Sequence, residues 1–199
     1  MRAILATLII APVVGAPVLQ AQVDYNARVG ITWATPLIRD DIFEEIEVQQ
    51  KLAPTLAFSA SLPIAPLYHA GLEVTLTSGG YQATEAGAST DLGTVRTGSI
   101  TLGLHGPISG DLYWRAGVGL LGYWPSDESG IFLQGGTTRF LAGAGIDYRR
   151  RAWSNWDLMG SLRYDFHRFT TDELQTRGFS QSQGVQRISA AVGLARGRP

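Results

Sequence analysis

The alternation of side chains in residues 156–167, WDLMGSLRYDFH, most constrains the fold of this chain. Successive side chains of a β-strand point to opposite faces, so every second residue lies on the same face. One face of this stretch is apolar with aromatic ends, and the other carries acids, an arginine and a histidine. The first face holds Trp156, Leu158, Gly160, Leu162, Tyr164 and Phe166, and the second holds Asp157, Met159, Ser161, Arg163, Asp165 and His167. A soluble protein would hide such an apolar face under a second layer of structure.

The same alternation occurs in eight segments of roughly 10–12 residues, the length that a tilted membrane strand requires. The segments are residues 23–34, 55–64, 68–78, 95–105, 112–124, 138–149, 156–167 and 185–195. Long polar connections at 35–52, 79–92, 125–137 and 168–184 alternate with tight turns at 63–67, 106–111 and 149–155. In an up-and-down meander, the long loops then all lie at one end and the tight turns at the other. Residues 42–50 fit neither a short helix nor a strand extension well.

These eight segments leave no chain for a covering layer, so the cover must be lipid. Backbone polar groups cannot stay unpaired in hydrocarbon, and only helices or closed sheets span it. No segment after the N-terminal region has the roughly 18 uninterrupted apolar residues that a membrane helix needs. We therefore predict an all-β fold, an eight-stranded antiparallel up-and-down transmembrane β-barrel with short periplasmic turns and long extracellular loops.

Residues 1–21 have the pattern of a secretory signal peptide, with Arg2 before an apolar run and Ala21 before a polar start. We expect cleavage after Ala21, which leaves residues 22–199 as the barrel. The alternative is an uncleaved membrane anchor, against which Pro12, Pro17 and the short run count. The absence of cysteine excludes disulfides and thiolate metal sites. A net charge of -1 gives no argument for a nucleic-acid partner.

Aromatic residues are sorted to two levels of the apolar face, which is typical of the two girdles of a membrane barrel. Ordinary core packing would explain any one of them alone. The level near the tight turns holds Tyr25, Tyr68, Trp114, Tyr148 and Trp156, and the level near the long loops holds Trp33, Phe58, Trp124, Phe140 and Phe166.

The opposite face would line a lumen with room only for side chains, because eight strands make a narrow barrel. Its residues include many Gly, Ser, Thr and Ala, charges of both signs and no aliphatic stripe. The predicted charge network is Arg28, Glu73, Arg115, Arg139, Asp147, Arg163, Asp165 and Arg187. Unpaired buried charges are costly, so we expect these to pair as a salt-bridged plug. An ion-selective path along the same residues is the alternative. A soluble lipocalin-type barrel would need the two faces exchanged.

The signal-peptide pattern, the eight segments, and FLAGAGIDYRR followed by NWDLMGSLRYDF resemble the outer-membrane β-barrel proteins. They are similar to the small OmpA-domain and OmpX-type barrels of diderm bacteria. The resemblance implies location in the cell outer membrane, insertion by the barrel assembly machinery, and no cofactor. It also implies contact with outer-membrane lipid and lipopolysaccharide. We expect a monomer with an envelope-structural or surface-interaction role, the alternative being a narrow pore for small solutes or ions.

A lipid A-modifying barrel enzyme is the less favoured alternative. A nucleophilic site needs a serine near a histidine that an acid holds in place. His105 and Ser109 are separated by a Gly-Pro turn, and the His-x-Ser pattern of lipid A deacylase barrels is absent. His167 faces inward beside Asp165, where a hydrogen-bonded lumen residue is the simpler interpretation. No metal-ligand spacing is present. We therefore expect no enzymatic activity, no catalytic residue and no metal.

Overall fold

Ten β-strands and one short helix make up the computed structural model, which describes residues 23–40, 46–85, 87–126, 132, 135–176 and 182–196. The elements are β1 (Asp24–Ala34), β2 (Ile38–Asp40), β3 (Ile46–Gln50), β4 (Ala53–Ala65), β5 (Tyr68–Glu85), β6 (Ala88–Ser109), β7 (Leu112–Pro125), β8 (Thr137–Trp153), β9 (Trp156–Phe169), α1 (Asp172–Thr176) and β10 (Gln183–Arg196). The predicted signal peptide lies outside the described residues. No helix in the described part of the chain is long and apolar enough to cross a membrane.

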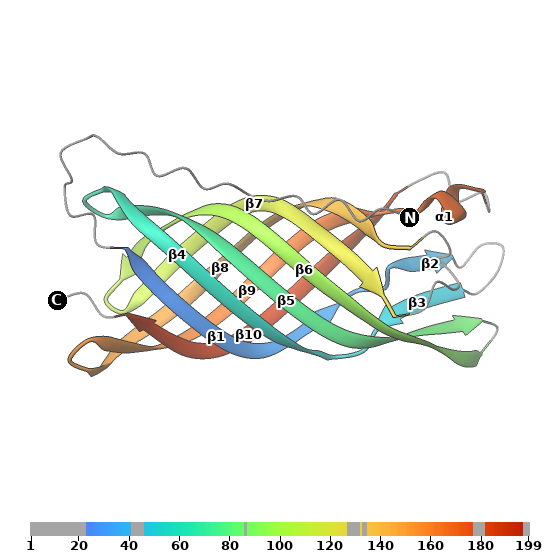
Figure 1. Ribbon diagram of the computed structural model, residues 1–199, viewed down its shortest axis with the longest axis horizontal. Coiled ribbons are helices and arrows are strands. Elements are labelled where there is room, and N and C mark those ends of the chain that lie inside the picture. The colour runs from blue at the N-terminus through green and yellow to red at the C-terminus, as the bar shows by residue number, and fades with distance from the viewer. Residues whose placement is uncertain are drawn as a thin grey trace, which may run out of the picture.

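Eight of the strands form a closed antiparallel ring (Figure 1). Its order is β1, β4, β5, β6, β7, β8, β9 and β10, and β10 pairs with β1 to close it. Neighbours in the ring are consecutive along the chain except where β2 and β3 intervene between β1 and β4. The three tight turns join β4 to β5, β6 to β7 and β8 to β9 at one end, which we call the turn end; the opposite end is the loop end. The predicted eight-stranded barrel is confirmed.

The two faces of the ring have opposite chemistry, as the alternation predicts. In β1, every second residue from Tyr25 to Trp33 is exposed on the outer face, whereas the residues that alternate with them are buried or half-buried toward the lumen. Large apolar side chains stay exposed all around the ring, up to 65% for Leu102 and Phe140. An apolar surface of this extent on a soluble monomer would cause aggregation, so it needs an apolar surrounding.

The strand ladder continues beyond the ring at the loop end, where the sequence predicts a loop. Strands β5 and β6 stay paired up to Glu85 and Ala88, and Gly87, at φ +82°, lies in the turn between them. On the free edge of β5, β3 pairs from Gln50↔Tyr81 to Ile46↔Glu85, and β2 pairs with β3. We call these four paired segments the loop-end sheet, which projects from the barrel in Figure 1. The prediction of a loop at 79–92 is wrong, because Gly, Ser and Thr accept extended backbone once a partner strand supplies hydrogen bonds.

Prolines lie in two strands near the turn end rather than only in the turns. The β4–β5 register shifts between Pro63 and Ala65, and the β6–β7 register shifts between Pro107 and Ser109. A bulge accommodates a residue that cannot donate to the ladder. The turns are therefore shorter than the predicted ones, and the strands correspondingly longer. In the fourth loop, α1 spans five residues.

Candidate functional site

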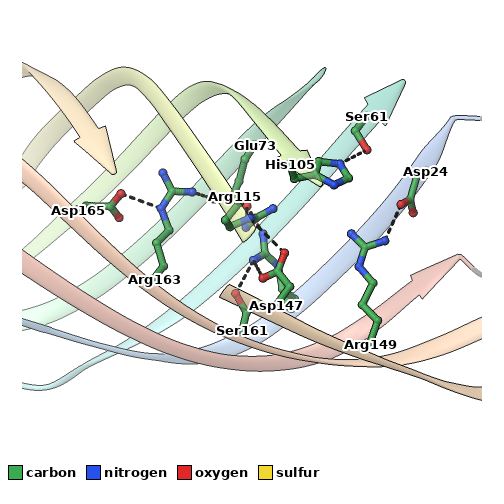
Figure 2. A network of polar contacts seen from close by, with 11 residues as sticks. Asp24, Ser61, Glu73, His105, Arg115, Asp147, Arg149, Ser161, Arg163 and Asp165 are labelled. Atoms are coloured by element: carbon green, nitrogen blue, oxygen red, sulfur yellow. Dashed lines mark hydrogen bonds and ion pairs between the residues drawn. The ribbon is translucent and has the colours of Figure 1, made fainter. Parts of the chain in front are cut away.

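The centre of the lumen is occupied by six charged side chains, which we call the central cluster: Arg28, Glu73, Arg115, Asp147, Arg163 and Asp165 (Figure 2). Three arginines face three acids, so the cluster has no net charge. Glu73 is its hub, because Arg28 and Arg163 contact its two carboxylate oxygens and Arg115 Nη1 lies 2.5 Å from Oε2. These side chains come from five different strands and close the middle of the barrel.

The other two acids of the cluster, Asp147 and Asp165, contact the arginines through atoms that do not face Glu73. Arg163 Nε donates to Asp165 Oδ1 at 2.7 Å, and Arg115 Nε lies 3.2 Å from Asp147 Oδ2. Arg28 Nη1 also donates to Ser161 Oγ at 3.0 Å. Charge-assisted hydrogen bonds of this kind are about twice as strong as neutral ones, and their fixed geometry holds the arginine side chains across the lumen.

Glycines on the inner face make room for these long side chains. A Cβ added at Gly143 would collide with the Asp165 carboxylate, and one at Gly193 would lie 2.8 Å from Arg28 Cγ. At Gly145 a Cβ would lie 3.4 Å from Arg115 Cδ. These three glycines thus have a steric role in the lumen.

Two predicted members of the charge network lie apart from the central cluster. Arg187 pairs in register with Asp165, but that carboxylate is held by Arg163, and Arg187 Nη2 instead donates to Thr97 Oγ1 at 3.1 Å. Around it, Thr32, Thr55, Thr77 and Ser189 are linked by hydroxyl hydrogen bonds of 2.6–3.1 Å. Arg139 donates to the Thr170 carbonyl oxygen near the loop end. Among the described residues, both arginines donate to neutral oxygens and neither forms an ion pair with a carboxylate.

A second ion pair closes the turn end of the lumen, and the sequence analysis missed it. Arg149 Nη1 lies 2.6 Å from Asp24 Oδ2, with both side chains buried. Asp24 falls on the predicted inner face, but Arg149 lies at the predicted boundary between the strand and the turn. Because β8 continues to Trp153, Arg149 remains on the ladder and points inward. This contact forms because β8 extends past residue 149, and the run of three arginines at 149–151 gives no sign of that extension.

The histidines occupy three places along the inner face. His105 Nε2 lies 2.9 Å from Ser61 Oγ, and its ring stacks on His69 with centroids 4.9 Å apart. His167 Nε2 lies 2.6 Å from the Tyr123 hydroxyl, near the loop end. The Ser61–His105 contact has the geometry of a nucleophile and a base. The adjoining cavity, which Glu73, Arg115 and Arg163 also line, measures only about 40 Å³. Such a volume holds about one water molecule.

An apolar cluster fills the lumen at the loop end. We call this set the mouth cluster: Ala34, Leu37, Ile38, Val48, Tyr81, Val95, Leu121, Tyr123, Phe132, Leu141, Phe169, Leu174 and Val185. Tyr123, Phe132 and Phe169 form its centre, with ring centroids 5.2–6.2 Å apart. The predicted inner face, with no aliphatic stripe, does not indicate this cluster, which forms because β2, β3 and α1 fold over the loop end and supply an apolar partner for the inward-facing strand ends.

The predicted girdle residues are all on the outer face. Nine of them are 40–65% exposed: Tyr25, Trp33, Phe58, Tyr68, Trp124, Phe140, Tyr148, Trp156 and Phe166. Trp114 is half-buried, with its ring centroid 6.3 Å from that of Tyr68. The ring therefore carries aromatic side chains near both of its ends.

Comparison with known proteins identifies the architecture. The crystal structure of Neisserial surface protein A matches with a TM-score of 0.57 and 14% sequence identity, over 87% of this chain and 96% of that one. This chain has the fold of the small outer-membrane β-barrels. The outer membrane protein AlkL in lipid bilayers matches with a TM-score of 0.54 and 13% identity, over 94% of both chains. OprG from Pseudomonas aeruginosa matches with a TM-score of 0.50 and 12% identity, over 88% of this chain and 96% of that one. No protein-family model matches the chain, and neither does any curated protein sequence.

Proposed function

We propose that this protein is an integral barrel of the cell outer membrane with a closed lumen, acting in envelope structure or surface interaction. The exposed apolar outer face supports a lipid surrounding, because only lipid covers such a face on a closed ring. Outward aromatic side chains near both ends support the same placement. Export through a cleaved signal peptide and insertion by the barrel assembly machinery are part of this proposal.

Closure of the lumen at two levels carries the proposal. The central cluster crosses the middle of the barrel with neutralised charges, and the mouth cluster packs apolar side chains across the loop end. A solute would have to displace both, and each is held by contacts among several strands. A conducting path needs a continuous line of water, whereas the cavity beside the central cluster measures about 40 Å³.

The loop-end sheet supports a role at the surface. Strands β5 and β6 extend the ladder past the ring, and β3 and β2 widen it on one side. An ordered sheet beyond the membrane offers backbone edges and side chains to partners without opening the barrel. The small size of the cavity beside Ser61 and His105 supports a non-enzymatic protein, since a lipid substrate has no access to that hydrogen bond.

Electrical recording of the purified, folded protein in planar lipid bilayers tests the closed lumen. We expect no discrete conductance steps from the wild-type protein. Reproducible steps in the wild type would overturn the proposal and favour the narrow pore. The membrane placement is tested by gel mobility of the detergent-extracted membrane fraction with and without boiling. A folded barrel shifts on boiling, whereas recovery of the protein with the soluble periplasm would contradict the proposal.

Mass spectrometry of lipid A with and without expression tests the enzymatic alternative. We expect identical profiles, because the Ser61–His105 hydrogen bond is buried and its cavity admits no lipid. A change in the acyl chains that is lost in Ser61→Ala would establish an enzyme instead.

A further inference from the structure

Outside the loop-end sheet, the charged residues at the described outward positions of the ring strands are all arginines, and they lie at the two ends of the ring. Among the described outward positions of the eight ring strands, Arg96 and Arg168 are near the loop end, and Arg150 and Arg196 are near the turn end. All four are exposed. The outward positions between these ends carry no charge, so each pair of arginines borders the apolar belt.

The two turn-end arginines flank the same strand. Arg150 of β8 pairs in register with Leu158 of β9, and Arg196 of β10 pairs with Trp156 of β9. Adjacent strands are about 4.8 Å apart, so the two arginines project from strands about 10 Å apart. Two extended arginine side chains can span that separation and meet around one phosphate group. Trp156, which is exposed between them, supplies the aromatic side chain that favours a membrane interface.

An apolar groove lies toward the middle of the belt and begins at Tyr148 and Gly160, the next outward pair after Arg150 and Leu158. It has a volume of about 490 Å³, and its outward-facing lining includes Ile146, Tyr148, Gly160, Leu162, Ala190 and Val192. Gly160 is opposite Tyr148 and Val192, and a Cβ built on it would meet nothing within 4 Å. Because Trp156, Leu158 and Gly160 are alternate residues of β9, and the two arginines pair with the first two of them, the arginines and the groove lie on the same face of the sheet.

We propose that this surface binds one phospholipid of the turn-end leaflet, with its phosphate between Arg150 and Arg196 and an acyl chain in the groove over Gly160. The proposal rests on the membrane placement proposed above. Guanidinium groups bind phosphate oxygens through paired hydrogen bonds, and arginine is well suited to this. The missing side chain at Gly160 leaves a space that an acyl chain fills without moving the protein.

Charge favours a lipid over a second copy of the chain in this groove. A two-fold dimer about an axis along the membrane normal would put the same patch of each copy at the interface. The arginine pairs of the two copies would then face each other at one membrane level, and like charges in an interface are unfavourable. An anionic lipid instead neutralises the pair.

Native mass spectrometry of the folded full-length protein, released from micelles with equal amounts of phosphatidylglycerol and phosphatidylethanolamine, tests the headgroup site. The test variant is Arg150→Gln with Arg196→Gln, and the matched control is Arg96→Gln with Arg168→Gln. Each arginine near an anionic lipid surface changes affinity about 5-fold, so we expect the test variant to retain phosphatidylglycerol about 25-fold less well. Equal retention in the test variant and the wild type, or an equal loss in the control, would overturn the site.

Gly160→Leu tests the acyl-chain groove, and Ala142→Leu, on the outer face away from the groove, is its control. We expect Gly160→Leu to lower retention of both lipids and Ala142→Leu to leave it unchanged. A dimer signal that Gly160→Leu removes would assign the groove to a second copy and overturn the lipid. Gel mobility with and without boiling checks that each variant is folded. A wild-type protein that does not insert into bilayers contradicts the proposed function, whereas one that inserts but retains no phospholipid overturns this site alone.

Discussion

Replacing Glu73 by glutamine should destabilise the barrel strongly, because Glu73 is the carboxylate that three arginines share. Arg28, Arg115 and Arg163 all contact it, and the four side chains are only 3–12% exposed. Without its charge, three arginines face two acids, Asp147 and Asp165. The cluster then carries one net positive charge inside a narrow lumen that water enters poorly.

The size of the effect follows from the burial of the ions that remain. Removing one partner of a buried ion pair costs about 3–5 kcal/mol, because the other charge stays desolvated and unpaired. Glutamine keeps the shape of Glu73 and one carbonyl oxygen that can still accept hydrogen bonds from the arginines. We therefore expect Glu73→Gln near the lower end of this range and Glu73→Ala near the upper end.

Urea unfolding of the protein in lipid vesicles, followed by tryptophan fluorescence, measures this loss. The matched control is Asp91→Asn, because Asp91 forms an exposed ion pair with Lys51 at 3.3 Å, and we expect no measurable change from it. Adding Arg115→Gln to Glu73→Gln restores charge balance, so the double variant should lose less than the sum of the two single losses. A loss below about 1 kcal/mol for Glu73→Gln, or strict additivity, would refute the central cluster as a coupled ionic unit.

Three further predictions concern other parts of the barrel. Leu162→Arg puts a charge in the middle of the outer face, so it should lower the free energy of unfolding by about 2–4 kcal/mol and reduce insertion into vesicles. Its control, Gln186→Arg near the loop end, should lower the free energy of unfolding by at most about 1 kcal/mol. Comparable insertion of the two variants would contradict the lipid-facing assignment. Phe169→Ala opens a cavity in the mouth cluster, so urea unfolding should show a stability loss of about 3–5 kcal/mol. The bilayer conductance should stay at zero, because the central cluster still closes the lumen. The control is Phe140→Ala, which removes an exposed side chain. Burial raises the pKa of Tyr81, whose hydroxyl donates to Gln50 Oε1 at 3.0 Å, above its ordinary value of 10.0. The folded state then binds more protons than the unfolded state above pH 10, so stability should fall more steeply there for the wild type than for Tyr81→Phe, and parallel pH profiles would be the contrary result.

The period-two alternation explains how much of the fold was predictable. A strand carries its two faces in its own sequence, so the segment at 156–167 reveals an apolar and a polar side without reference to any neighbour. Eight such segments, joined by alternating long and short connections, leave an antiparallel closed ring as the solution. The outward positions of Trp33, Phe140 and Tyr148, and the inward positions of the charged residues, follow from the same local rule.

The contacts inside the lumen depend on the ring as a whole. Glu73 meets Arg28 across 45 residues of sequence and Arg163 across 90, because strand register puts the three side chains at one level. Alternation predicts the face of the sheet on which a side chain lies. It does not predict the position of that side chain along the barrel axis or the direction in which the side chain extends. For this reason the inward arginines were predictable, whereas the departure of Arg187 toward Thr97 was not.

Sequence by itself determined the number of ring strands, their faces and the apolar belt, since these depend on neighbours only one or two residues apart. Tertiary structure decided where each strand ends and what closes the lumen. The ladder of β5 and β6 continues past Gly79 because β3 supplies a partner at its edge, and the mouth cluster exists because β2, β3 and α1 fold over the strand ends. The longer ladder and the mouth cluster both form between segments that are far apart in the chain and that cover each other's backbone and apolar surface. Such contacts produce no periodic pattern in the local sequence.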